Sequence, residues 1–103
     1  MTHSPLASPR ATIDVLRAHG LGTKKSLGQH FLVDDNVVGR ILAISDLTGD
    51  EVVVEVGPGI GTLSAALCAN AKAVVAVERD PRLEPVLGDT MRGCATFQLI
   101  VHD

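Results

Sequence analysis

The segment from residue 51 to residue 71 constrains the fold more than any other part of this 103-residue sequence. A β-branched run, 51–56 (EVVVEV), is followed by a glycine-rich turn, 57–61 (GPGIG), and then by helix-forming residues, 62–71. A short, continuous apolar run that ends at a glycine turn predicts a strand buried on both faces. The segment therefore predicts a strand–turn–helix unit of a parallel α/β sheet.

The same alternation continues along the chain. Residues 73–77 (AVVAV) predict a second strand, and residues 96–101 (TFQLIV) predict a third. Between them, Asp80 and the proline after it predict a helix N-terminus. Pro85 and Gly88 lie inside that helix, so we expect it to be short or distorted. Strands that alternate with helices in this way are typical of the α/β class.

Residues 1–31 differ from the rest of the chain in charge. They contain four basic residues (Lys or Arg) and one acidic residue, whereas residues 32–103 contain five basic and eleven acidic residues. A basic arm ahead of an acidic body is suited to an anionic partner such as RNA, although a solvated tail explains the same charges. We therefore divide the chain into an N-terminal arm, 1–31, and an α/β part, 32–103.

Local signals predict the elements that precede the sheet. Residues 1–9 are rich in Ser and Pro and predict a disordered leader. Residues 12–19 predict a short helix with Thr12 as its N-cap, and residues 21–32 predict a loop. A second helix is expected to begin after a cap at Asp34 or Asp35.

Composition excludes several classes of protein. With 46% hydrophobic residues the chain is not expected to be disordered, and two cysteines are too few for a disulfide scaffold. No apolar run reaches the ~18–20 residues that a membrane span needs, and no signal peptide is recognisable. We expect a cytoplasmic protein with no membrane partner.

The glycine turn and the acid that follows the second strand together predict a nucleoside site. Glu78 comes 21 residues after Gly57, and a carboxylate at this place accepts hydrogen bonds from ribose hydroxyls. Thr62 stands where the dinucleotide fingerprint requires glycine, so a nicotinamide-dependent dehydrogenase is disfavoured. An adenosine cofactor without phosphates fits better, with S-adenosylmethionine as the candidate and Glu55 facing its methionine end. The competing interpretation is an ordinary strand–helix turn with glycines.

Three segments carry a family resemblance: 27–32 (LGQHFL), 54–63 (VEVGPGIGTL) and 77–80 (VERD). They resemble the ribosomal RNA adenine N6,N6-dimethyltransferases of the KsgA type, which are related to the Erm resistance methyltransferases. The similarity runs from about Ile13 to the last residue. It implies the N-terminal part of a Rossmann-like methyltransferase fold, with the loop of the basic arm beside the cofactor.

The resemblance also implies a set of site residues and partners. The contacts to S-adenosylmethionine would come from His30, Leu32, Gly57, Glu78 and Asp103, with no metal. Position 30 is histidine where the family usually has asparagine. The implied substrate is 16S rRNA in the small ribosomal subunit, so the implied role is in rRNA processing.

The implied reaction is the transfer of two methyl groups to N6 of adenine. The family's adenine-clamping motif, N-L-P-Y or a close variant, does not occur in these 103 residues. We therefore expect an N-terminal fragment without a catalytic residue of its own, inactive when alone. Two alternatives stay open: a fragment of an Erm-type enzyme acting on large-subunit rRNA, and a non-catalytic RNA-binding fragment that uses Lys24 and Lys25.

The resemblance finally implies a weak point in the sheet. In the methyltransferase fold the strand at 51–56 is central, and its second neighbour would be a later strand. Without that neighbour we expect an apolar strand at an open edge and self-association through it.

Overall fold

The computed structural model describes residues 2–22 and 31–103. In this part of the chain a parallel sheet is built from β1 (Val52–Val56), β2 (Ala73–Glu78) and β3 (Phe97–Val101), in the order β1-β2-β3. Val54 lies opposite Val75, which in turn lies opposite Gln98. The α/β class and the three strands predicted from the sequence are confirmed.

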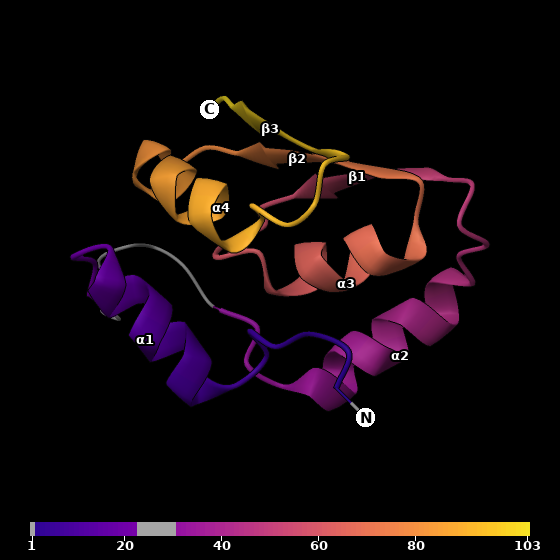
Figure 1. Cartoon of the computed structure of the whole chain (residues 1–103), viewed down its shortest axis with the longest axis horizontal. Coiled ribbons are helices and arrows are strands. Elements are labelled where there is room, and N and C mark those ends of the chain that lie inside the picture. Colours follow the sequence, from indigo (N-terminus) through magenta and orange to yellow (C-terminus); the bar gives the residue numbers. More distant parts are fainter. Residues whose placement is uncertain (1, 23–30) are drawn as a thin grey trace.

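The helices form two further layers on one side of the sheet (Figure 1). The nearer layer holds α3 (Thr62–Asn70) and α4 (Glu84–Thr90), and the farther layer holds α1 (Pro9–Ala18) and α2 (Asp35–Ser45). As predicted, Asp34 caps α2, because its carboxylate accepts a hydrogen bond from the Asn36 N–H at 2.9 Å. None of the helices in these described ranges is long and apolar enough to cross a membrane.

Pro85 divides the segment after β2 into two short helices. A 3₁₀ turn, η2 (Pro81–Leu83), comes first and is capped by Asp80, and α4 begins directly after it. Pro85 thus lies in the first turn of α4, where a missing N–H removes no helical hydrogen bond. The prediction of a short or distorted helix is confirmed.

The predicted start of α1 is wrong. The helix begins at Pro9, and Ser8 is its N-cap, with its hydroxyl accepting a hydrogen bond from the Ala11 N–H at 3.0 Å. Thr12 is instead buried inside the helix, where its hydroxyl donates to the Ser8 carbonyl at 2.9 Å. Serine is a better N-cap than threonine, and the proline at the first helical position also favours Ser8.

The predicted disordered leader is also wrong for residues 2–9. The N–H groups of His3 and Ser4 donate to the carboxylate of Asp35 at 2.9 and 2.8 Å, and Ser4 is only 2% exposed. The acceptor lies 31 residues further along the chain, at the start of α2. Local composition carries no signal for a partner at that distance.

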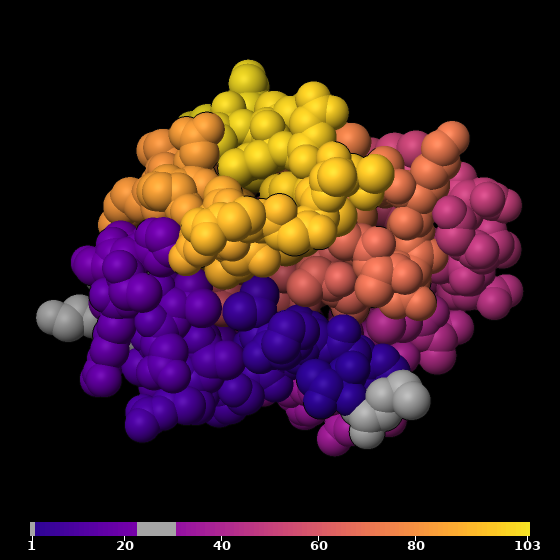
Figure 2. All heavy atoms as spheres, viewed as in Figure 1, coloured from indigo at the N-terminus to yellow at the C-terminus, as the bar shows by residue number. Residues whose placement is uncertain are grey.

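The core joins the N-terminal helix to the layer beneath the sheet. Leu16 of α1 is fully buried in a cluster with Ile60, Leu83 and Leu87. Figure 2 shows the indigo and violet N-terminal residues lying directly against the orange and yellow ones of α4. Residues of the predicted arm therefore share one core with the α/β part.

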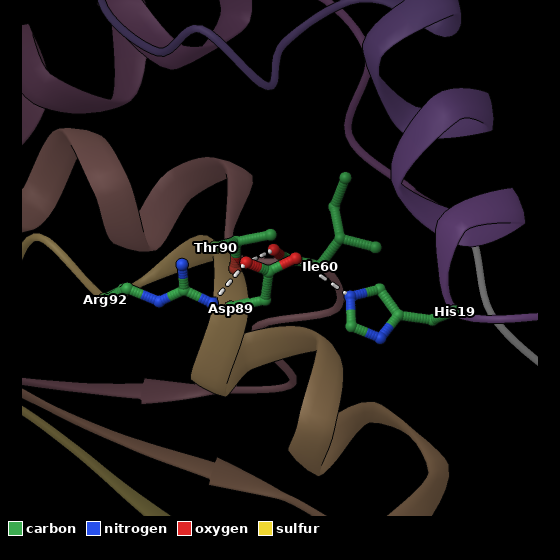
Figure 3. Close-up of polar contacts among 5 residues, drawn as sticks. All are labelled: His19, Ile60, Asp89, Thr90 and Arg92. Carbon is green, nitrogen blue, oxygen red and sulfur yellow. Dashed lines mark hydrogen bonds and ion pairs between the residues drawn. The ribbon is translucent and has the colours of Figure 1, made fainter.

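Polar contacts reinforce this junction (Figure 3). Nε2 of His19, just after α1, lies 3.1 Å from an Asp89 carboxylate oxygen on α4, and Arg92 lies 2.9 Å from the other oxygen. The neighbouring Thr90 hydroxyl donates to the Ile60 carbonyl at 2.7 Å. The end of α4 is thereby connected both to α1 and to the turn that precedes α3.

The face of the sheet away from the helices is uncovered in the described part of the chain. Val52, Val54 and Val56 of β1 are 59%, 66% and 82% exposed. The prediction that this strand is buried on both faces is therefore wrong. Among residues 2–22 and 31–103, β1 pairs only with β2, so it also forms an edge of the sheet, as the resemblance implied.

Candidate functional site

The turn between β1 and α3 requires glycine at three positions. Gly57, Gly59 and Gly61 have φ angles of 73°, 62° and 97°, in the left-handed region that residues with a Cβ avoid. The Gly57 N–H donates to the Val77 carbonyl at 2.9 Å, which fixes the turn against the end of β2. No described atom outside the adjacent residues lies within 4 Å of where a Cβ on Gly57 would stand. The backbone is therefore open to a ligand at that point.

Glu78 braces the glycine turn from the end of β2. The side chain is 2% exposed, and its carboxylate accepts hydrogen bonds from the Gly59 N–H at 3.4 Å and the Asp80 N–H at 3.0 Å. The longer contact is a weak one by length. A carboxylate has about four acceptor positions, so further donors can bind to the same group.

A cavity of about 560 Å³ opens at the carboxyl ends of the three strands. Its volume lies in the range of small-molecule sites, roughly 300–1,000 Å³. Ligands of open α/β sheets bind at this edge, outside the carboxyl ends of the strands. The lining residues are Val56, Gly57, Val77, Glu78, Arg79, His102 and Asp103.

A second, smaller cavity of about 170 Å³ also adjoins the glycine turn. The turn itself forms much of the cavity wall. Other lining residues include Phe31, Leu32, Glu55 and Thr62. Val56 and Gly57 line both cavities. A ligand that crosses Gly57 can therefore occupy both at once.

Glu55 is a buried acid in the wall of the smaller cavity. Burial raises the pKa of its carboxyl group, and the hydrogen bond from Ser64 acts in the opposite direction without cancelling that effect. The Ser64 hydroxyl donates to Oε1 of Glu55 at 2.5 Å. This contact holds the acid against the first turns of α3.

Thr62 carries an unpaired polar atom beside the same cavity. The residue is 3% exposed, and its hydroxyl has no hydrogen-bond partner in the described part of the chain. Buried polar groups in folded proteins are nearly always paired, with protein, water or ligand. Thr62 also lines the smaller cavity, which makes its hydroxyl a candidate for a ligand contact there.

The structure brings together four of the five site residues named from the sequence. Leu32 lines the smaller cavity, Glu78 and Asp103 line the larger one, and Gly57 lines both. His30 lies outside the described residues.

Several residues that line the two cavities were not named as contacts from the sequence. Arg79 and His102 line the larger cavity, and Phe31 lines the smaller one. Arg79 and His102 directly follow the last residues of β2 and β3, and that position is the signal that could have found them. Residues 2–22 and 31–103 contain no group of three His, Cys, Asp or Glu side chains that could hold a metal.

Comparison with proteins of known sequence assigns this arrangement to a family. The family model described as "Ribosomal RNA adenine dimethylase" matches residues 20–103. "Ribosomal RNA small subunit methyltransferase A" of Pelotomaculum thermopropionicum is 42% identical over 95% of this chain, and that of Geobacillus thermodenitrificans is 42% identical over 98%. The chain spans about a third of the length of these curated relatives, 33% and 34%.

Solved structures agree with this assignment. The 23S rRNA methyltransferase ErmE superposes with a TM-score of 0.67 at 34% identity, over 72% of this chain and 30% of that one. A dimethyladenosine transferase from Plasmodium falciparum gives the same TM-score at 22% identity, over 72% and 28%, and shows the shared fold. The family model spans the glycine turn and all three strands, and the chain belongs to the ribosomal RNA adenine dimethylase family.

Proposed function

We propose that this chain forms the S-adenosylmethionine-binding part of an enzyme that dimethylates N6 of adenine in 16S rRNA. The observation that carries the proposal is the pair of cavities that meet at Gly57. One contains the buried carboxylate expected for a ribose, and the other contains a buried acid and an unpaired hydroxyl. An elongated ligand with a nucleoside at one end and an amino acid at the other matches this division.

The described residues fit such a cofactor. In this proposal Glu78 binds the ribose hydroxyls, Asp103 the adenine amino group, and Glu55 the methionine end. Open space at the Cβ position of Gly57 leaves room for the ligand to pass across the turn. Leu32 contributes an apolar wall, and His30 is proposed to donate a hydrogen bond from its ring. When bound, the cofactor supplies an electrophilic methyl group.

The contribution of these residues to the reaction is binding and orientation. An adenine amine is a poor nucleophile, so the reaction depends on positioning and on polar groups that hold the amine. The N-L-P-Y motif implied by the family does not occur among the 103 residues. We therefore propose that this chain contributes no catalytic residue and that its role is to hold the cofactor.

The proposed partner is 16S rRNA in the small ribosomal subunit, and the proposed location is the cytoplasm. The named small-subunit methyltransferases match at 42% identity over nearly the whole chain, whereas the large-subunit enzyme ErmE matches at 34% over less of it. This difference favours the small-subunit substrate over the Erm-type one. The basic arm, 1–31, is proposed to contact rRNA phosphates, in which case RNA binding weakens with salt.

Calorimetric titration with S-adenosylhomocysteine tests the cofactor site. Glu78→Gln keeps an acceptor for the turn but loses the charge, and we expect affinity to fall at least ~10-fold, or about 1.4 kcal/mol. Glu84→Gln is the matched control, because Glu84 is exposed on α4 and lines neither cavity. Equal affinity for the wild type and Glu78→Gln would remove the ribose role.

A methyl-transfer assay tests whether this chain holds the cofactor without contributing a catalytic residue. Radiolabelled S-adenosylmethionine and under-methylated 30S subunits are incubated with the chain, and we expect no incorporation into rRNA. Robust incorporation would show that residues 1–103 supply the adenine-binding groups themselves.

A further inference from the structure

A cavity of about 410 Å³ lies apart from the two cavities at the glycine turn, and none of its described lining residues lines either of them. It lies between the second half of α3 and the connection from α4 to β3. Cys68 of α3 and Cys94 of that connection both line it. The remaining lining residues are Ala65, Ala69, Thr90, Met91, Gly93, Ala95 and Thr96. Nothing in the proposed function uses either thiol.

The fold places the two cysteines together from distant parts of the sequence. Both side chains are half-buried and pack against the same apolar cluster around Leu87 and Met91. Each cysteine shifts the pKa of the other, as neighbouring titratable groups do. Sγ of Cys94 also lies 3.6 Å from the Thr96 hydroxyl. The pair is accessible through the cavity and is held by surrounding structure on both sides.

Their surroundings give the two thiols different reactivity. Burial and the neighbouring Cys94 raise the pKa of Cys68 to about 12, so it stays a thiol. Burial also acts to raise the pKa of Cys94, but hydrogen bonds from Cys68 and Thr96 outweigh it and bring that pKa below its ordinary value. The thiolate is the reactive form of cysteine, so these shifts favour Cys94 over Cys68 as the nucleophile of the pair.

We propose that Cys68 and Cys94 are a redox-active pair that a hydroperoxide converts to a reversible disulfide. The Cys94 thiolate attacks one peroxide oxygen and breaks the O–O bond, which gives a sulfenic acid and, after protonation, water or an alcohol. The Cys68 sulfur then attacks the Cys94 sulfur, the Cys68 proton passes to the departing oxygen, and the S–O bond breaks with loss of water. Two thiols are oxidised by two electrons in total and the hydroperoxide is reduced.

The disulfide would connect α3 to the segment before β3. It closes the chain between residues 68 and 94, which contains β2, η2 and α4. Because a cross-link of this kind restricts the unfolded chain, we expect the oxidised form to melt at least about 5 °C higher than the reduced form. Cys68 and Cys94 line neither cavity at the glycine turn, so oxidation of the pair does not require the cofactor site.

Thiol mapping on the full chain tests the proposal. The reduced protein is treated with hydrogen peroxide, alkylated with N-ethylmaleimide, and digested with trypsin. The cysteines fall in separate tryptic peptides because Lys72, Arg79 and Arg92 lie between them. We expect a monomer that has lost two hydrogen atoms, a cross-linked peptide that contains Cys68 and Cys94, and recovery of both thiols on reduction. Two free, alkylated cysteines or disulfide-linked dimers alone would overturn the proposal.

Single variants separate the two roles. In Cys68→Ser, Cys94 should form a sulfenic acid that dimedone traps. In Cys94→Ser, the remaining Cys68 should react with peroxide at least ~10-fold more slowly, because it is mostly thiol at neutral pH. Equal rates in the two variants would overturn the assignment of Cys94 as the nucleophile.

Discussion

Replacing Gly61 with alanine tests how closely the glycine turn packs against α4. Gly61 has a φ of 97° and is the N-cap of α3. A Cβ at this position would lie 2.9 Å from Oγ1 of Thr90, 3.2 Å from Sδ of Met91 and 3.3 Å from Cδ2 of Leu87. The first of these distances is shorter than real Cβ contacts, so Thr90 must move.

The magnitude follows from two separate effects. Alanine in the left-handed region costs about 1–2 kcal/mol. Displacement of Thr90 weakens its 2.7 Å hydrogen bond to the Ile60 carbonyl (Figure 3), and overpacking of this kind costs about 1–3 kcal/mol. We therefore expect Gly61→Ala to lower the free energy of unfolding by about 2–5 kcal/mol, a large part of the 5–15 kcal/mol that holds a small domain together.

Gly57→Ala is the matched control for the backbone effect. Gly57 also has a positive φ, but no described atom outside the adjacent residues lies within 4 Å of its Cβ position. It should therefore lose only the strain of about 1–2 kcal/mol. Urea unfolding followed by far-UV circular dichroism measures both variants, since the chain has no Trp or Tyr for fluorescence. Equal losses in the two variants would refute the contact with Thr90.

Three further predictions concern the cavities and the sheet. Thr62→Val should weaken S-adenosylhomocysteine binding several-fold in calorimetry while Thr62→Ser does not, and equal affinity in both variants would refute a hydroxyl contact. Burial raises the pKa of Glu55 above its ordinary 4.5, so the folded chain holds the proton more tightly than the unfolded chain does. The free energy of unfolding should therefore fall as the pH rises from 4.5 to the folded-state pKa. Urea titrations at several pH values measure this slope, and Glu55→Gln should flatten it. Val54→Lys, at the exposed face of the edge strand β1, should reduce self-association in light scattering. Ile44→Lys, at an exposed residue of α2, should not. A monomeric wild type would contradict open-edge association.

Residues near one another in the sequence determined the elements of this fold. The β-branched run before Gly57, the glycines of the turn and the apolar run of β2 are local signals, and each was found where predicted. Asp34 as a cap and Pro85 as a disruptor are equally local. Leu32, Gly57, Glu78 and Asp103 were named through spacing and family resemblance, and the structure places them around adjoining cavities.

Tertiary contacts decided the rest, because those contacts join residues that are far apart in the chain. The partner of His3 and Ser4 is Asp35, and the burial of Leu16 depends on Leu83 and Leu87. An apolar strand has the same sequence pattern whether or not another layer covers its outer face, so the exposure of β1 was not predictable from its residues. The packing of α3 likewise places Cys68 and Cys94 on one cavity and leaves the Thr62 hydroxyl unpaired in the described part of the chain. Burial and hydrogen bonding depend on neighbours in space rather than on neighbours in sequence.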